Sequence, residues 1–258
     1  MAKKTKIITF SNQKGGVGKT TTCINLAAYL ASDGKDVLVI DMDPQGNASS
    51  GLGFETRKAK KSLYNVLCGS MSIAEAMFQT EIPSLKLLPS SMDLAGAEIE
   101  LAQVVIGRER VLSEKLAEID DKFDYIMIDC PPSLGLLTVN ALTASNSVLV
   151  PIQCEYYALE GLSQMMNTIR LVKKFLNPTI EVEGVVLTLY DGRAKLSTQV
   201  ADEIVKFFGD KVFETKIPRN IRLAEAPSYG KPIVLYDKRC SGAKAYCELK
   251  DEFLKKIK

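Results

Sequence analysis

The chain of 258 residues contains no histidine. This absence excludes Ser-His-Asp triads and histidine general bases, and it excludes most catalytic zinc sites because their ligands usually include histidine. Any chemistry in this protein must therefore use carboxylates, lysines, hydroxyl groups or a bound metal ion.

The sequence also lacks long apolar runs and paired cysteine motifs. No segment approaches the roughly 18 apolar residues that a membrane-spanning helix needs, and residues 1–6 lead into a strand pattern, not a signal-peptide core. The six cysteines form no C-x-x-C pair, so we expect small core residues in a reducing compartment. These absences predict a soluble, cytoplasmic protein.

What is present is an ordinary globular composition, with 46% hydrophobic and 25% charged residues. A chain of this length buries about three quarters of its unfolded surface. Since no composition break or internal repeat divides it, we predict a single domain over residues 1–258. Residues 186–258 hold 15 Lys and Arg against 10 Asp and Glu, whereas residues 1–185 hold 18 against 21. This asymmetry is typical either of a polyanion-binding surface or of a solvated one.

Strand and helix patterns alternate along the chain. Apolar strand candidates occupy residues 6–10, 37–41, 85–88, 124–129, 147–152 and 183–190. Helical periodicity marks residues 19–32, 108–119, 159–176, 194–208 and 241–257. The alternation predicts an α/β fold, a doubly wound and mostly parallel sheet with helices on both faces and ligands outside the carboxyl ends of the strands.

Residues 12–21, NQKGGVGKTT, place a glycine-rich turn between the first strand and the first helix. Such a turn directs backbone N–H groups toward one point, where the helix dipole also favours an anion. The pattern therefore predicts a phosphate-binding loop in which Lys19 reaches the phosphates and the Thr20 hydroxyl binds Mg²⁺.

Two further strands end in carboxylates where a Mg-nucleotide site needs them. One runs into Asp41 and Asp43, and the other ends at Asp129. The second is the Walker B arrangement, in which Asp129 holds the Mg²⁺ shell.

The loop departs from the standard G-x-x-x-x-G-K-[ST] pattern at Gln13 and carries a second lysine, Lys14, before the glycine pair. The resulting K-G-G-V-G-K-T-T resembles the deviant Walker A loop of the ParA/MinD ATPases, a branch of the P-loop NTPases. The resemblance implies that ATP and Mg²⁺ are bound and that Lys14 reaches across a homodimer to the partner's nucleotide. The nucleotide-binding residues that it implies are Lys14, Gly15, Gly16, Val17, Gly18, Lys19, Thr20 and Thr21.

Two later segments resemble the switch segments of ParA proteins, D-M-D-P-Q-G-N from Asp41 as switch I and D-C-P-P-S-L-G from Asp129 as switch II. Residues 153–163 and 217–232 resemble the Soj-type chromosomal branch of ParA. In that family the aspartate matching Asp43 orients or activates the attacking water, and the loop matching Pro218 and Asn220 closes over the adenine. Arg193 and Arg222 match positions that hold DNA, although lone arginines are often simply solvated.

The resemblance implies a dimeric ATPase that is weak alone and stimulated by DNA and a partner. It would bind double-stranded DNA without sequence specificity and partition chromosomes or plasmids with a ParB-type protein, on the nucleoid when ATP-bound.

Three alternatives stay open. A MinD-like membrane switch needs an amphipathic tail, but residues 241–258 read as a closing helix with Leu249, Phe253 and Ile257 on the core, so we expect no stable membrane association. A protein like nitrogenase reductase needs two suitably placed cysteines, and only Cys130 is near switch II, the segment that begins at Asp129. A purely structural, non-hydrolysing protein is the third.

Overall fold

The computed structural model describes residues 5–119, 121–155 and 158–256. Ile257 and residues 156–157 of the Soj-like segment lie outside these ranges. The strands are β1 (Lys6–Phe10), β2 (Val37–Asp41), β3 (Phe78–Gln79), β4 (Leu85–Leu88), β5 (Tyr125–Asp129), β6 (Ser147–Gln153) and β7 (Glu181–Thr188). The α-helices are α1 (Lys19–Ser32), α2 (Asn47–Gly51), α3 (Leu63–Leu67), α4 (Ile73–Ala76), α5 (Leu94–Gln103), α6 (Val111–Leu116), α7 (Leu136–Ala144), α8 (Ala158–Phe175), α9 (Lys195–Phe208), α10 (Ile221–Glu225), α11 (Ile233–Tyr236) and α12 (Ser241–Lys256).

The strands form one sheet in the order β3-β4-β2-β5-β1-β6-β7 across the described ranges. Every pairing is parallel except that of β3 with β4, so the predicted doubly wound, mostly parallel architecture is confirmed. Because β1 lies between β5 and β6, the crevice at its carboxyl end is the topological switch point where such sheets bind ligands.

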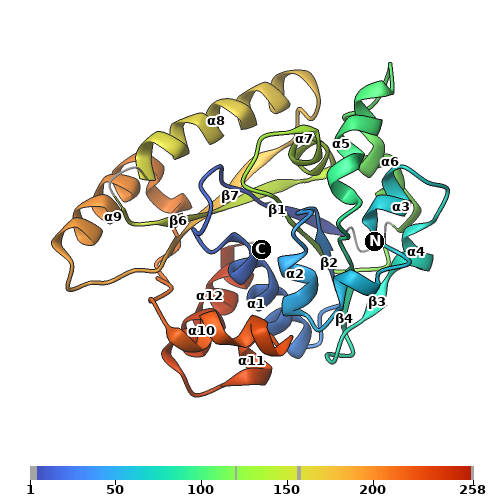
Figure 1. Cartoon of the computed structure of the whole chain (residues 1–258). Helices are drawn as coiled ribbons and strands as arrows, with labels where there is room; N and C mark the ends of the chain where they lie inside the picture. The colour runs from blue at the N-terminus through green and yellow to red at the C-terminus, as the bar shows by residue number, and fades with distance from the viewer. Residues whose placement is uncertain (1–4, 120, 156–157, 257–258) are drawn as a thin grey trace.

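Helices cover both faces of the sheet, as Figure 1 shows with α7 and α8 above it and α1 and α12 below. Alternate residues of one strand serve opposite faces. Val37 and Val39 of β2 belong to the core cluster under α1 and α12, whereas Leu38 and Ile40 belong to the cluster under α5, α6 and α7. This two-sided burial explains the continuously apolar strands.

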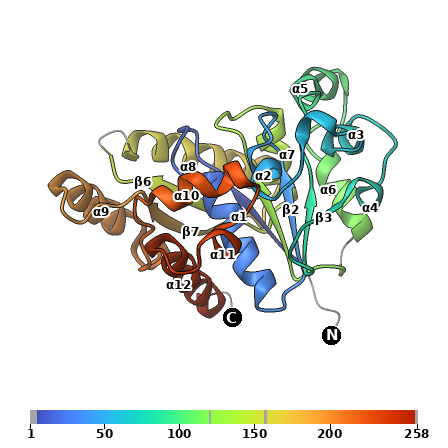
Figure 2. The same ribbon diagram turned by 60° about the horizontal axis from the view of Figure 1, so that its bottom comes forward.

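The C-terminal elements return to the first helix. Figure 2 shows α10 and α11 beside α1 and α12. Tyr29 of α1 donates a 2.8 Å hydrogen bond to the Ala243 carbonyl, and Leu249 and Phe253 of α12 are fully buried. The predicted core face of the last helix is therefore confirmed for these two residues, and the segment after β7 is held against the phosphate loop's own helix.

The sequence prediction was wrong in extent at one helix and missed others. The predicted helix over residues 108–119 is α-helical only over Val111–Leu116, because residues 107–110 form a turn that Gly107 enters with φ of +85°. Residues 117–119 form a 3-10 turn. The missed elements include α5, α7 and the short antiparallel edge strand β3.

Candidate nucleotide-binding site

The glycine-rich turn forms an open cradle between β1 and α1. Gly16 and Gly18 have φ of +73° and +80°, in the left-handed region that favours glycine. Lys19 is the first residue of α1, so the helix begins with free N–H groups directly after the turn. Thr188 at the end of β7 donates a 2.7 Å hydrogen bond to the Val17 carbonyl. The sheet itself thus fixes the loop in a conformation suited to an anion.

Lys19 lies buried behind this cradle. The residue is 7% exposed, and its Nζ donates a 3.1 Å hydrogen bond to the carbonyl of Lys14. Burial lowers the pKa of the Lys19 ammonium, while the nearby Asp129 carboxylate acts in the opposite direction. A phosphate group arriving here would supply the compensating negative charge that a desolvated ammonium lacks.

Lys14 faces a different neighbour. Its Nζ lies 2.7 Å from Oε2 of Glu155, and the two side chains are 34% and 48% exposed. In this monomer the second lysine of the loop is therefore engaged at the protein surface. A pair so exposed is easily exchanged for another anion.

Thr20 and Asp129 meet at the base of the cradle. The Thr20 hydroxyl donates a 2.7 Å hydrogen bond to Oδ2 of Asp129. The other carboxylate oxygen, Oδ1, is buried without a hydrogen-bond partner among the described residues. Burial, together with the charge of Asp41, raises the pKa of Asp129 well above its usual range.

An unsatisfied buried carboxylate oxygen beside a threonine hydroxyl is a donor set that suits Mg²⁺. Within the described ranges no three Cys, Asp or Glu residues gather into a metal-binding group. The residues fit an ion that takes few protein ligands and completes its shell with phosphate and water, as Mg²⁺ does at nucleotide sites.

Asp41 and Asp43 are held by a buried serine network. Ser49 donates to Oδ2 of Asp41 from both its backbone N–H and its hydroxyl, each at 2.7 Å. Its hydroxyl also accepts from the Ser90 N–H at 2.9 Å, and the Ser90 hydroxyl donates to the Asp43 carbonyl at 2.6 Å. Burial raises the pKa of Asp41 to about 6 despite these donors. Asp41 thus accepts hydrogen bonds that hold the backbone of residues 43 and 49, whereas Asp43 lines the cavity.

Lys19, Thr20 and Asp43 line one cavity of about 680 Å³, a size typical of small-ligand sites. Asp129 is fully buried behind Thr20 and lies outside the lining. The predicted residues that line the cavity are Gly15, Gly16, Gly18, Lys19, Thr20, Thr21, Asp43, Pro218 and Asn220. Val17 lies outside the lining because its side chain is buried, and Lys14 lies outside it because it contacts Glu155. The structure therefore brings the P-loop and the Pro218–Asn220 loop together around one space, although they are some 200 residues apart.

Asn220 contributes to this wall in a way that the sequence did not reveal. Its Oδ1 accepts hydrogen bonds from the N–H groups of Arg222 and Leu223 at 2.8 and 3.3 Å, and its Nδ2 donates to the Ser241 hydroxyl at 2.8 Å. Oδ1 thus caps α10, and one of the two N–H groups of Nδ2 connects the loop to the start of α12.

The two predicted DNA-binding arginines lie outside the cavity lining. Arg193, whose side chain is 93% exposed, follows β7 and contacts Asp191 at 3.1 Å. Arg222 is on α10, and its Nη1 lies 2.9 Å from Oε2 of Glu225. A bridge between Tyr190 and Pro218 places the two loops next to each other at the carboxyl end of the sheet.

Sequence reasoning missed the residues that hold the site in place. Thr188, Ser49 and Ser90 carry no motif, and their contacts with Val17, Ser90 and Asp43 join segments at least 41 residues apart.

Two of the alternatives find no support in the described residues. None of the described helices combines the length and apolarity needed to cross a bilayer, and α12 packs its apolar residues into the core. Cys130 is 1% exposed, so it is not presented for a cluster shared between subunits. All six cysteines are free, and Cys23, Cys130 and Cys154 are buried as expected.

Comparison with known proteins gives consistent matches over nearly the whole chain. Residues 5–182 match the family model described as an AAA domain. The sporulation initiation inhibitor protein Soj of Bacillus subtilis is 55% identical over 247 residues, which cover 96% of this chain and 97% of Soj. The chromosome partitioning protein ParA of Caulobacter vibrioides is 51% identical over 251 residues, covering 96% and 94%.

Among solved structures, the cobyrinic acid a,c-diamide synthase of Mycobacterium smegmatis with bound ADP and magnesium superimposes with a TM-score of 0.84. It is 38% identical in sequence, and the match covers 97% of this chain and 94% of that one.

Proposed function

The chain belongs to the Soj/ParA family of chromosome-partitioning ATPases, and on that premise we propose that it is an ATP-dependent dimeric switch that binds DNA and hydrolyses ATP slowly. The observation that carries the proposal is the pairing of Thr20 with Asp129 beneath the P-loop, with one carboxylate oxygen left for a metal ion. A protein that bound only an anion at the P-loop would not need a buried carboxylate beside Thr20.

The protein's own residues divide the work of phosphoryl transfer. Thr20 and Asp129 would hold Mg²⁺, which would supply charge neutralisation at the phosphates. Lys19 and the backbone N–H groups of Gly16 and Gly18 bind and orient the phosphate chain. Asp43, which lines the cavity, orients the attacking water, and its backbone is fixed through Ser90. Phosphoryl transfer mainly requires such positioning, so one aspartate suffices for a slow ATPase.

Dimerisation follows from Lys14. We infer that its ammonium exchanges the carboxylate of Glu155 for the phosphates bound in a second copy of the chain. The exchange replaces an exposed ion pair, worth little in water, by contact with a multiply charged anion. The γ-phosphate thereby stabilises the dimer, and hydrolysis releases it.

In the ATP-bound dimer, Arg193 and Arg222 of two subunits double the phosphate contacts and give sequence-independent affinity for double-stranded DNA. A ParB-type protein would stimulate hydrolysis and so reset the switch. The expected location is the cytoplasm, on the nucleoid in the ATP-bound form and without stable attachment to a membrane.

Light scattering with Mg²⁺ and a non-hydrolysable ATP analogue tests this proposal, with Gly15→Val as the matched variant. A Cβ at Gly15 meets nothing within 4 Å, so the monomer can accept the side chain. We expect wild type to dimerise with the analogue but not with ADP, and the variant to bind nucleotide as a monomer. Wild-type protein that stays monomeric with the analogue would contradict the switch.

A further inference from the structure

Arg222 is fixed to the wall of the nucleotide cavity through its backbone. Its N–H donates to Oδ1 of Asn220, and the amide of Asn220 is anchored in turn to Ser241 at the start of α12. The guanidinium therefore extends from an element with a defined position, and its surroundings are a property of the fold.

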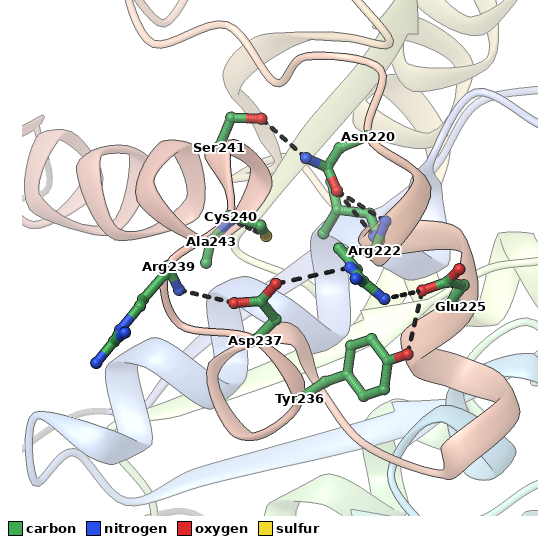
Figure 3. Close-up of polar contacts among 10 residues, drawn as sticks. Asn220, Arg222, Glu225, Tyr236, Asp237, Arg239, Cys240, Ser241 and Ala243 are labelled. Atoms are coloured by element: carbon green, nitrogen blue, oxygen red, sulfur yellow. Dashed lines mark hydrogen bonds and ion pairs between the residues drawn. The ribbon is translucent and has the colours of Figure 1, made fainter.

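Two carboxylates surround this guanidinium, as Figure 3 shows. Nη1 of Arg222 lies 2.9 Å from Oε2 of Glu225, and its Nε lies 3.8 Å from Oδ2 of Asp237. The Tyr236 hydroxyl donates to the same Glu225 oxygen at 3.1 Å, and the Arg239 N–H donates to Oδ1 of Asp237 at 3.0 Å. Each carboxylate is thus positioned next to Arg222 by a hydrogen bond from another residue.

In the absence of DNA, the net charge around Arg222 is negative and does not favour the binding of a polyanion. A phosphate that approaches Arg222 meets two negative groups already in place around one positive group. The side chains are exposed, however, at 54% for Arg222, 38% for Glu225 and 34% for Asp237. Exposed ion pairs contribute little to stability, so a DNA phosphate can displace them at a modest cost.

We propose that Glu225 is an affinity-determining residue of the DNA-binding surface: it occupies Arg222 in place of a DNA phosphate, and binding of DNA displaces it. Tyr236 positions Glu225 for this competition, and Asp237 adds a weaker, longer contact. The inference rests on the proposed DNA binding and adds to it the group that limits the affinity.

Glu225→Gln tests the proposal because it removes the competing charge and keeps the size of the side chain. Fluorescence anisotropy with a labelled duplex of mixed sequence, Mg²⁺ and a non-hydrolysable ATP analogue measures the affinity. We expect Glu225→Gln to bind DNA about threefold to tenfold more tightly than wild type, since each dimer releases two exposed ion pairs. Tyr236→Phe keeps every charge and removes one anchor of Glu225, so a smaller gain is expected.

Two controls separate displacement of Arg222 from a general change of charge. Glu118→Gln breaks another i,i+3 pair, with Lys115 at 3.9 Å. This pair lies in the segment that leads into the amino end of β5, whereas Arg222 lies at the carboxyl end of the sheet. The substitution changes the net charge equally and should leave DNA affinity near wild type. The double variant Arg222→Ala/Glu225→Gln should bind no more tightly than Arg222→Ala, because the gain depends on the freed guanidinium.

The outcomes separate a failure of DNA binding from a failure of the role of Glu225. If wild type does not bind the duplex in any nucleotide state, the proposed function fails. If wild type binds and Arg222→Ala weakens binding, but Glu225→Gln equals wild type, the inference about Glu225 is wrong. It is equally wrong if the gain persists without Arg222 or appears in Glu118→Gln. Circular dichroism and nucleotide affinity, both expected unchanged, exclude a folding defect as the cause.

Discussion

Lys19 and Asp129 at the P-loop are 7% and 0% exposed, whereas the side chains of Arg193 and Arg222, near the outer rim, are 93% and 54% exposed. The buried groups have positions fixed by the sheet and by hydrogen bonds from remote segments. Each exposed arginine contacts a carboxylate two or three residues away in the sequence, and Arg222 also lies 3.8 Å from Asp237. The P-loop groups are therefore already positioned for a ligand, whereas each arginine must break an ion pair with a carboxylate before it can bind a phosphate.

This difference has a thermodynamic consequence. The buried cradle contains charges whose desolvation is compensated only in part, so a ligand bound there gains strong electrostatic interactions. The arginine surface is solvated and screened, so each contact is weak and affinity comes from the number of contacts. Variants in the cradle should accordingly have larger effects than variants on the surface.

The largest effect is expected for Asp43→Ala. If Asp43 acts on the attacking water, its loss should slow ATP hydrolysis by about 10² to 10⁴-fold, with ATP affinity nearly unchanged. The trapped dimer should remain on DNA. Turnover and DNA retention of one preparation measure both, with Asp202→Ala, an exposed carboxylate on α9, as the control. Hydrolysis at the wild-type rate, or a failure to dimerise, would mean that Asp43 has another role.

Lys19→Ala should come next. Losing a charged donor to phosphate costs about 1.5 to 3 kcal/mol, or about 10 to 150-fold in nucleotide affinity. Dimerisation and DNA binding should be lost together with the nucleotide. Isothermal titration with ATP analogue checks this against Lys60→Ala, which removes an exposed lysine. If the two variants bind the nucleotide with equal affinity, Lys19 does not contact the phosphates.

Ser49→Ala tests the buried network that sequence reasoning missed. It takes one donor from Asp41 and leaves the Ser90 N–H without its partner, so we expect about 1 to 3 kcal/mol of lost stability. Chemical denaturation measures the loss, with the exposed Ser70→Ala as control. If both variants unfold at the same denaturant concentration, the network is not a structural support of the site.

The smallest effect is expected on the arginine surface. Arg193→Ala should weaken binding to all DNA sequences alike by several-fold, and removing one phosphate interaction should lower the slope of the salt dependence by about 1. Nucleotide affinity should stay at the wild-type value. Weaker binding confined to one DNA sequence would mean that the surface reads bases and not phosphates.

The sequence predicted the fold wherever a pattern reflected a local cause. Apolar strands buried on both faces, the buried helix α1 and the amphipathic helices α8, α9 and α12 appeared close to their predicted bounds. Helix α7 was missed because its residues, LLTVNALTA, are apolar on nearly all sides and carry no helical periodicity. Its Asn140 is buried and accepts a hydrogen bond from the N–H of Leu112, a contact that only the tertiary structure reveals.

The candidate site divides in the same way. The P-loop and the two acidic strand ends could be predicted because their chemistry requires particular residues at fixed spacing. The contact of Lys14 with Glu155 and the approach of Asp237 to Arg222 could not be predicted, because folding brings these partners together from separate segments. The cap by Asn220 and the pair of Arg222 with Glu225 are local, and they were missed because the short helix α10 was not predicted.

The most direct test of the account compares DNA binding by wild-type protein without nucleotide, with ADP and with a non-hydrolysable ATP analogue, at one protein and one salt concentration. Sedimentation of the same samples reports their oligomeric state. The account predicts that the analogue alone produces a dimer and tight, salt-sensitive DNA binding, because only the γ-phosphate joins the buried cradles and brings both arginine surfaces to one duplex. Equal DNA affinity in all three states would contradict it.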